Sequence, residues 1–263
     1  MQLSLSGFLF EEDYKRQSLS FEDFAVLARQ AGYTGVELRD TQINLNTSGN
    51  AVSQYRSVLD DNGLCVTCMI PRKMPLEDEE RSDLFARYLD LAAKMGCRLL
   101  KVSGNPHWLR LATHKAAGYG IVVATGTHIN SPTETVSGTK KLLEEVNHHN
   151  FGLLYDCMHL AIAAEDYLGA IDILYPHIYN VLVQCVHPTD KGENAVITYA
   201  NTKYVKTRID ERPIQNWPAV FAKLKHLGYN GLITVIENTW PIEKRKDIAF
   251  VYAKYIKELW CKL

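Results

Sequence analysis

The chain has 263 residues, 46% of them hydrophobic and 22% charged, and its 29 basic residues almost balance its 30 acidic ones. These values are ordinary for a soluble globular protein and fit one large α/β domain or two small ones. Most nucleic-acid-binding proteins have an excess of basic residues, and the near-neutral net charge shows no such excess, so we expect no nucleic-acid partner.

The sequence also indicates where the protein resides. No stretch approaches 18 uncharged apolar residues, so no membrane span is expected. The N-terminal residues lack a basic region followed by a long apolar run, which a signal peptide would show. The six cysteines are scattered and mostly lie in apolar runs, which is typical of buried, reduced thiols. We therefore expect a cytoplasmic protein.

Short apolar segments alternate with helical patterns along the whole chain. In order, the segments that predict strands are Leu3–Phe8, Gly35–Leu38, Leu64–Ile70, Leu99–Ser103, Ile121–Ala124, Gly152–Tyr155, Val181–Val186 and Leu232–Ile236. The predicted helices between and after them are Phe21–Gln30, Ala51–Asp60, Glu79–Met95, Leu109–Ala117, Thr135–Asn147, Ala161–Leu174, Trp217–Leu227 and Glu243–Leu259.

This repeated alternation predicts an α/β fold, a closed (β/α)8 TIM barrel that forms a single domain over residues 1–263. Gly32 and Gly228 each follow a helix and precede a strand, which suits the left-handed conformation that ends helices. The one long irregular stretch, Pro188–Pro213, follows a predicted strand directly, where long loops often cover active sites.

Three predicted strands are followed by a residue that is able to bind a metal. These residues are Asp156, His187 and Glu237, which lie far apart in the sequence. In a βα barrel the chemistry gathers at the carboxyl ends of the strands, so we expect these side chains to converge on one pocket. For two of them a structural role remains open: Asp156 as a helix cap and His187 as a core histidine. For Glu237 a functional role is favoured, because charged residues rarely end apolar strands without a partner.

Cys65 and Cys68 match a Cys-x-x-Cys spacing, but they lie in an apparent strand. Positions three apart on a strand face opposite sides, whereas a redox or zinc pair needs a turn or a helix start. We expect plain core cysteines.

Four motifs together give the chain a resemblance to a known family: Gly32–Leu38, Asp156–His159, Val186–Asp190 and Gly228–Glu237. In order, spacing and placement at strand ends, the chain resembles the xylose isomerase-like TIM barrel family, which includes sugar phosphate isomerases and epimerases. The resemblance extends from Phe21 to about Trp260.

The resemblance implies a divalent metal ion, Mn, Mg, Co or Zn, held by Glu, Asp, His and Glu from strands five to eight. The last three correspond to Asp156, His187 and Glu237. Where the family typically shows Glu-Asn-His after the fifth strand, this chain has Gly126, Thr127 and His128. His128 is then the candidate for the vacant ligand position, or a base.

The missing glutamate is also one of the two carboxylates that exchange protons in many family epimerases. The resemblance therefore leaves Glu237 as the catalytic carboxylate. It places His159 near the substrate, or in contact with the metal ligands as a residue that orients them. Further candidates would contact a sugar-like substrate. Lys101 and Arg208 are candidates to bind an anionic group, and Glu37 is a candidate to touch the substrate. His107 and Trp108 could form one wall of the pocket, since sugar sites often use an aromatic face.

These features predict a metal-dependent isomerase or epimerase that moves a proton beside the carbonyl of a sugar or keto-polyol, a small-molecule partner. A related lyase or dehydratase begins with the same proton abstraction. A degenerate barrel that binds a small molecule without turnover is the alternative, and Gly126 favours it. The near-neutral charge disfavours a nuclease. A homo-oligomer remains open.

Overall fold

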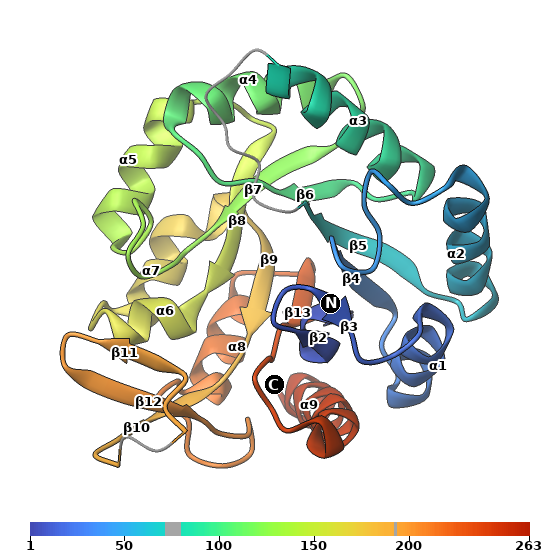
Figure 1. The fold of residues 1–263 in the computed structure, drawn as a ribbon. Coiled ribbons are helices and arrows are strands. Elements are labelled where there is room, and N and C mark those ends of the chain that lie inside the picture. Colours follow the sequence, from blue (N-terminus) through green and yellow to red (C-terminus); the bar gives the residue numbers. More distant parts are fainter. Residues whose placement is uncertain (72–79, 192–193) are drawn as a thin grey trace.

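A computed structural model describes residues 1–71, 80–191 and 194–263. Its centre is a closed barrel of eight parallel strands surrounded by helices, which confirms the predicted (β/α)8 TIM barrel (Figure 1). Every barrel strand coincides with one of the predicted apolar segments. In their order around the barrel, the strands are β1 (Gln2–Ser6), β13 (Leu232–Val235), β9 (Ile178–Val183), β8 (Phe151–Asp156), β7 (Val122–Gly126), β6 (Leu99–Lys101), β5 (Cys65–Ile70) and β4 (Gly35–Arg39).

The helices lie where the apolar periodicity predicts them, with one exception. The expected helix Ala161–Leu174 is instead two helices, α6 (Cys157–Ile162) and α7 (Tyr167–Leu174), separated by a turn in which Ala164 has a φ of 59°. Glu79, the first residue of another expected helix, lies outside the described residues. The helices are α1 (Phe21–Ala31), α2 (Gly49–Asp61), α3 (Glu80–Lys94), α4 (Pro106–Ala117), α5 (Val136–Val146), α6 (Cys157–Ile162), α7 (Tyr167–Leu174), α8 (Trp217–His226) and α9 (Ile242–Lys262), with short 3₁₀ turns η1 (Gly7–Phe10) and η2 (Tyr175–His177).

Local chemistry fixes the start and end of the first helix. The Ser20 side chain accepts a hydrogen bond from the backbone N–H of Asp23, and Gly32 ends the helix with a φ of 82°. Gly228 has a φ of 76° after α8. These positive values confirm that both glycines take the left-handed conformation, which side chains rarely tolerate.

Two groups of apolar side chains hold the barrel together. The larger one fills the layer between strands and helices. The smaller one, which includes Leu99, Ala124, Leu154 and Leu182, comes from neighbouring strands and packs together inside the barrel. All six cysteines are free, but Cys65 is exposed, so only Cys68 of the predicted pair is a core cysteine.

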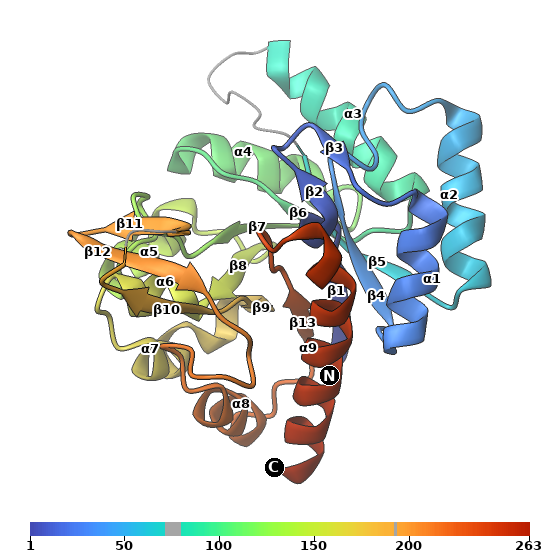
Figure 2. The same ribbon diagram turned by 60° about the horizontal axis from the view of Figure 1, so that its bottom comes forward.

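The stretch Pro188–Pro213 was expected to be irregular, but parts of it form strands. Outside the barrel a three-stranded antiparallel sheet overlaps this stretch, and its order is β10 (Val186–Thr189), β12 (Thr202–Lys206), β11 (Ile197–Tyr199) (Figure 2). It packs on α6 through Tyr204 and Val186, which join Met158 and Ile162 in a separate apolar cluster. A small hairpin near the N-terminus pairs β2 (Glu11–Glu12) with β3 (Arg16–Gln17).

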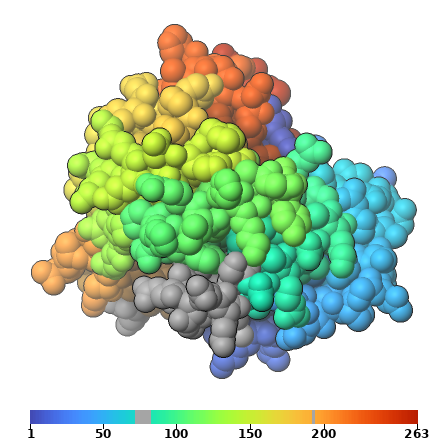
Figure 3. Space-filling model, turned by 90° about the horizontal axis from the view of Figure 1, so that it is seen from above, coloured from blue at the N-terminus to red at the C-terminus, as the bar shows by residue number. Residues whose placement is uncertain are grey.

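Figure 3 shows one face of the molecule, with the green segment that contains α4 near its centre. None of the described helices combines the length and apolar character that crossing a membrane would require.

Candidate functional site

The last inward-facing position of several strands carries a polar side chain. Side chains alternate along a strand, so a residue two positions beyond one that packs inside the barrel points to the same side. Starting from Leu99, Ala124, Leu154 and Leu182, this rule places at the carboxyl-terminal mouth the residues Lys101, Gly126, Asp156 and Gln184.

Glu237, directly beyond β13, is fully buried and surrounded by donors. Its Oε1 accepts hydrogen bonds from the Cys185 backbone N–H at 2.6 Å and from the Tyr252 hydroxyl at 2.7 Å. Its Oε2 accepts one from Trp240 Nε1 at 2.9 Å and pairs with Lys206 Nζ at 3.1 Å. A carboxylate offers about four acceptor positions, and all are used here. The Glu237 carboxylate therefore binds four neighbouring donors and has no acceptor position left for a proton from a substrate.

Asp156 is the last residue of β8 and also caps α6, since its Oδ1 accepts a hydrogen bond from the Met158 backbone N–H at 3.1 Å. Its Oδ2 accepts one from Gln184 Nε2 at 2.6 Å, and Gln184 Oε1 accepts one from Lys206 Nζ at 3.3 Å. Burial raises the pKa of Asp156 to about 6. A continuous chain of polar contacts thus connects Asp156 through Gln184 and Lys206 to Glu237.

Glu37 on β4 has a different environment, although it is also fully buried. Its Oε1 accepts a hydrogen bond from the Ser6 hydroxyl at 2.5 Å, while its Oε2 has no partner among the described residues. Burial raises the pKa of Glu37, and the positive charges of Arg39 and Lys101 oppose that rise. Glu37 therefore keeps an acceptor that no described residue uses, whereas the acceptor positions of Glu237 are all used.

Lys101 supplies a positive charge to the same region. Within the described ranges its Nζ forms neither a hydrogen bond nor an ion pair, yet its charge influences the pKa values of Glu37, Asp156, His128 and His159. A Cβ on Gly126 would lie 3.4 Å from its Cε and 3.5 Å from its Nζ. Lys101 thus extends beside the position at which the resemblance places a glutamate.

Two histidine rings, those of His128 and His159, lie close together with centroids 3.9 Å apart and planes tilted by 33°. The charge of Lys101 acts on both. The Nδ1 of His128 lies 2.6 Å from the carbonyl oxygen of Ile129, which accepts only, so Nδ1 carries the hydrogen and Nε2 keeps a lone pair in the neutral ring. Burial lowers the pKa of His128, and it lowers that of His159 to about 2. His159 Nε2 lies 3.8 Å from Asp156 Oδ2, but a ring that stays neutral forms no ion pair there.

Four of the expected site residues lie elsewhere. His187 is exposed on β10, where its Nδ1 lies 3.0 Å from the Arg212 carbonyl oxygen.

His107 is exposed on α4. Trp108 is buried against Phe85 of α3, with ring centroids 5.7 Å apart, as part of the layer outside the barrel. Arg208 forms a partly exposed ion pair with Asp210 at 2.6 Å. The pocket wall expected of His107 and Trp108 is therefore not formed, and His187 does not join Asp156 and Glu237.

The residues at the mouth do not fit the divalent metal ion that the resemblance implies. The described residues contain no group of three or more His, Cys, Asp and Glu side chains arranged to hold a metal ion. The acceptor positions of Glu237 are used, and the Lys206 ammonium lies 3.1 Å from its Oε2. Like unit charges 4 Å apart repel by about 4 kcal/mol at moderate screening, and a divalent ion doubles that cost.

Gln184 and Lys206 are the two site residues that the sequence did not reveal. The predicted strand extends from Val181 to Val186, but β9 ends at Val183 and Gln184 turns inward. A polar residue after three apolar ones was the available signal for Gln184. Lys206 has no such signal, because it arrives from β12 of the outer sheet.

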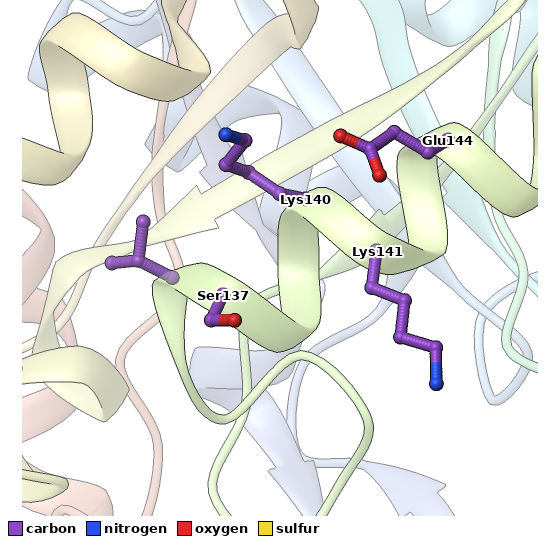
Figure 4. A pocket seen from close by; sticks show the side chains of 5 residues that line it. Ser137, Lys140, Lys141 and Glu144 are labelled. Atoms are coloured by element: carbon purple, nitrogen blue, oxygen red, sulfur yellow. The ribbon is translucent and has the colours of Figure 1, made fainter.

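One surface hollow lies away from this mouth. It is lined by Val136, Ser137, Lys140, Lys141 and Glu144, all from α5 (Figure 4). The side chains come from consecutive turns of one helix, so the hollow brings together no groups from different elements.

The fold is a TIM barrel with a cluster of polar groups at the carboxyl ends of its strands. The chain belongs to the xylose isomerase-like TIM barrel family, whose model matches residues 25–254. The predicted resemblance is thereby confirmed. No curated protein matches the chain.

Similar solved structures share this fold. One is the probable 3-DHS dehydratase AsbF from Bacillus anthracis, with 19% identity over 98% of this chain and 99% of that one, and a TM-score of 0.79. D-psicose 3-epimerase, solved in the presence of D-fructose, has 14% identity over 99% of each chain and a TM-score of 0.76. A xylose isomerase-like protein from Mycobacterium smegmatis in complex with magnesium has 14% identity over 99% and 97%, with a TM-score of 0.73.

Proposed function

We propose that this protein is an isomerase or epimerase, or a related dehydratase, that moves a proton beside the carbonyl group of a small polyhydroxylated compound. The observation that carries the proposal is the Lys101 ammonium, which has no bonding partner among the described residues and whose charge acts on Glu37 and His128 at the mouth. Membership of a family that includes sugar isomerases, and similarity to an epimerase and a probable dehydratase, support the same class.

The three groups have complementary chemical capacities. Glu37 Oε2 and His128 Nε2 each keep a lone pair that is able to accept a proton. Lys101 supplies positive charge where a carbonyl oxygen becomes negative as the neighbouring proton leaves. A carboxylate and an imidazole replace, in this proposal, the two carboxylates that the resemblance led us to expect.

Exchange with solvent tests the proposal without knowledge of the product. The protein is incubated in D₂O with ketoses, ketose phosphates and cyclic hydroxyketones, and NMR follows the loss of the C–H signal beside the carbonyl. We expect exchange with at least one compound. Replacing a positioned general base typically costs about 100-fold or more, so Glu37→Gln should be nearly inactive.

His107→Gln is the matched control for His128→Gln, because His107 is an exposed histidine away from the mouth. Equal rates in the Glu37→Gln, His128→Gln and wild-type proteins would contradict the assignment. Binding of a compound, seen as a rise in melting temperature, without any exchange would favour the alternative, a barrel that binds a small molecule without turnover.

A further inference from the structure

The side chain of Lys206 lies at the mouth although its strand belongs to the outer sheet. The side chain is only 7% exposed, and it pairs with Glu237, whose side chain is fully buried. Lys206 is the last residue of β12, so the barrel receives this ammonium group from outside its eight strands. A buried ammonium group is retained only where acceptors compensate its loss of water.

The acceptors around Lys206 are the groups that would otherwise face a metal ion. Its Nζ lies 3.1 Å from Glu237 Oε2 and 3.3 Å from Gln184 Oε1. Gln184 in turn donates to Asp156 Oδ2 at 2.6 Å. Asp156 and Glu237 are two of the ligands that the family resemblance implies, and one lysine connects both.

The other two ligand positions that the resemblance implies also lack a metal ligand at the mouth. Gln184 is the first residue beyond the seventh strand, and its amide bonds to Asp156 and Lys206. His187, which the resemblance matches to the histidine ligand, is instead exposed on β10. Gly126 leaves open the place of the fourth ligand, and the end of Lys101 lies beside it. The positive charges of Lys101 and Lys206 equal the charge of one divalent ion.

We infer that the mouth is independent of a metal ion and that the Lys206 ammonium holds the position that a divalent cation would otherwise take between Asp156 and Glu237. The inference concerns the same mouth as the proposed reaction but does not rest on it, because it is tested by metal binding and stability alone.

The first test titrates the purified full-length protein with Mn²⁺ and follows free Mn²⁺ by electron paramagnetic resonance. We expect no saturable binding up to about 1 mM Mn²⁺ and the same melting temperature with EDTA as with Mn²⁺. Stoichiometric binding at micromolar concentration, with a matching rise in melting temperature, would overturn the inference.

The second test changes the lysine. Lys206→Met should lower the melting temperature by several degrees, and millimolar Mn²⁺ should raise it again, since Asp156 and Glu237 lose their shared cation. Lys206→Arg keeps the charge and should remain insensitive to Mn²⁺. Lys203→Met, an exposed position on the same strand, should match the wild type throughout.

A Lys206→Met protein as stable as the Lys203→Met protein, or one that Mn²⁺ leaves unchanged, would contradict the role assigned to Lys206. If Lys206→Met does not fold, the Mn²⁺ titration of the wild type and the behaviour of Lys206→Arg still decide the question.

Discussion

The barrel mouth has two halves that differ in how completely their polar groups are bonded. In the bonded half, Asp156, Gln184, Lys206 and Glu237 form one chain of contacts between 2.6 and 3.3 Å. In the open half, which consists of Glu37, Lys101 and His128, Glu37 Oε2 and the Lys101 ammonium have no bonding partner among the described residues. Paired buried charges stabilise a fold only through their partners, whereas unused ones remain available to a ligand. We expect stability to depend on the bonded half and chemistry on the open half.

The sharpest test compares the same substitution in both halves. Glu237→Gln leaves the Lys206 ammonium buried without a counter-charge, and breaking such a pair typically costs 3–5 kcal/mol, so we expect a loss of about 4 kcal/mol. Glu37→Gln should change the free energy of unfolding by less than about 1 kcal/mol, because burial already disfavours the charge of Glu37. Urea unfolding measures both. Equal losses in the two variants would break the comparison.

The second prediction reverses the comparison and asks which half carries the chemistry. Lys101→Met should lower the rate of C–H exchange by about 100-fold, because removing one group that stabilises a developing oxyanion usually costs that much. Its unfolding free energy should change little, since Lys101 has no ion pair in the described structure. NMR exchange rates and urea unfolding of the same preparation separate the two effects. A variant that exchanges at the wild-type rate would exclude Lys101 from the reaction.

The contrast between the halves also shows what the sequence was able to predict. Apolar runs predicted all eight barrel strands, and a charged residue after such a run marked Asp156 and Glu237, since charges rarely end buried strands without a partner. The residues that bond to them were harder to predict. The motif Val186–Asp190 suggested a ligand at His187, but Val186 is buried in the separate cluster beneath the outer sheet. The apolar character of Val186 therefore reflects packing in that cluster and not in the barrel. For this reason β9 ends at Val183, before the end of the predicted strand at Val186.

A third prediction uses the opposite effects of burial on two groups of the mouth. The folded pKa of His159 is about 2, below its usual value near 6.5, so its contribution to stability is lost as the pH falls below about 6.5. The folded pKa of Asp156 is about 6, above its usual value near 3.8, so its contribution is present at low pH and is lost as the pH rises through about 6.

Between pH 4 and 6 the two contributions largely cancel in the wild type, each amounting to about 2 kcal/mol over that window. Relative to the wild type, His159→Gln should lose stability as the pH rises from 4 to 6, and Asp156→Asn should gain it. Urea unfolding at several pH values gives both differences, and contributions from other groups cancel in them. Slopes of the same sign in the two variants would contradict the opposite assignments.

The smallest expected effect is at Gly126, beside Lys101 of the open half. A Cβ there would lie 3.4 Å from Lys101 Cε and 3.5 Å from its Nζ, which the flexible end of a lysine accommodates. Gly126→Ala should stabilise the protein by about 0.5 kcal/mol through the unfolded chain, with the exchange rate nearly unchanged.

Gly126→Glu places a carboxylate beside the same ammonium and should pair with it, so exchange should fall although the protein stays folded. If the glutamate instead leaves exchange intact, the free charge of Lys101 is not what the reaction uses, and the open half must act through Glu37 and His128 alone. Gly126→Ala measures the effect of filling the space beside Lys101, and Gly126→Glu adds the effect of neutralising the charge of Lys101.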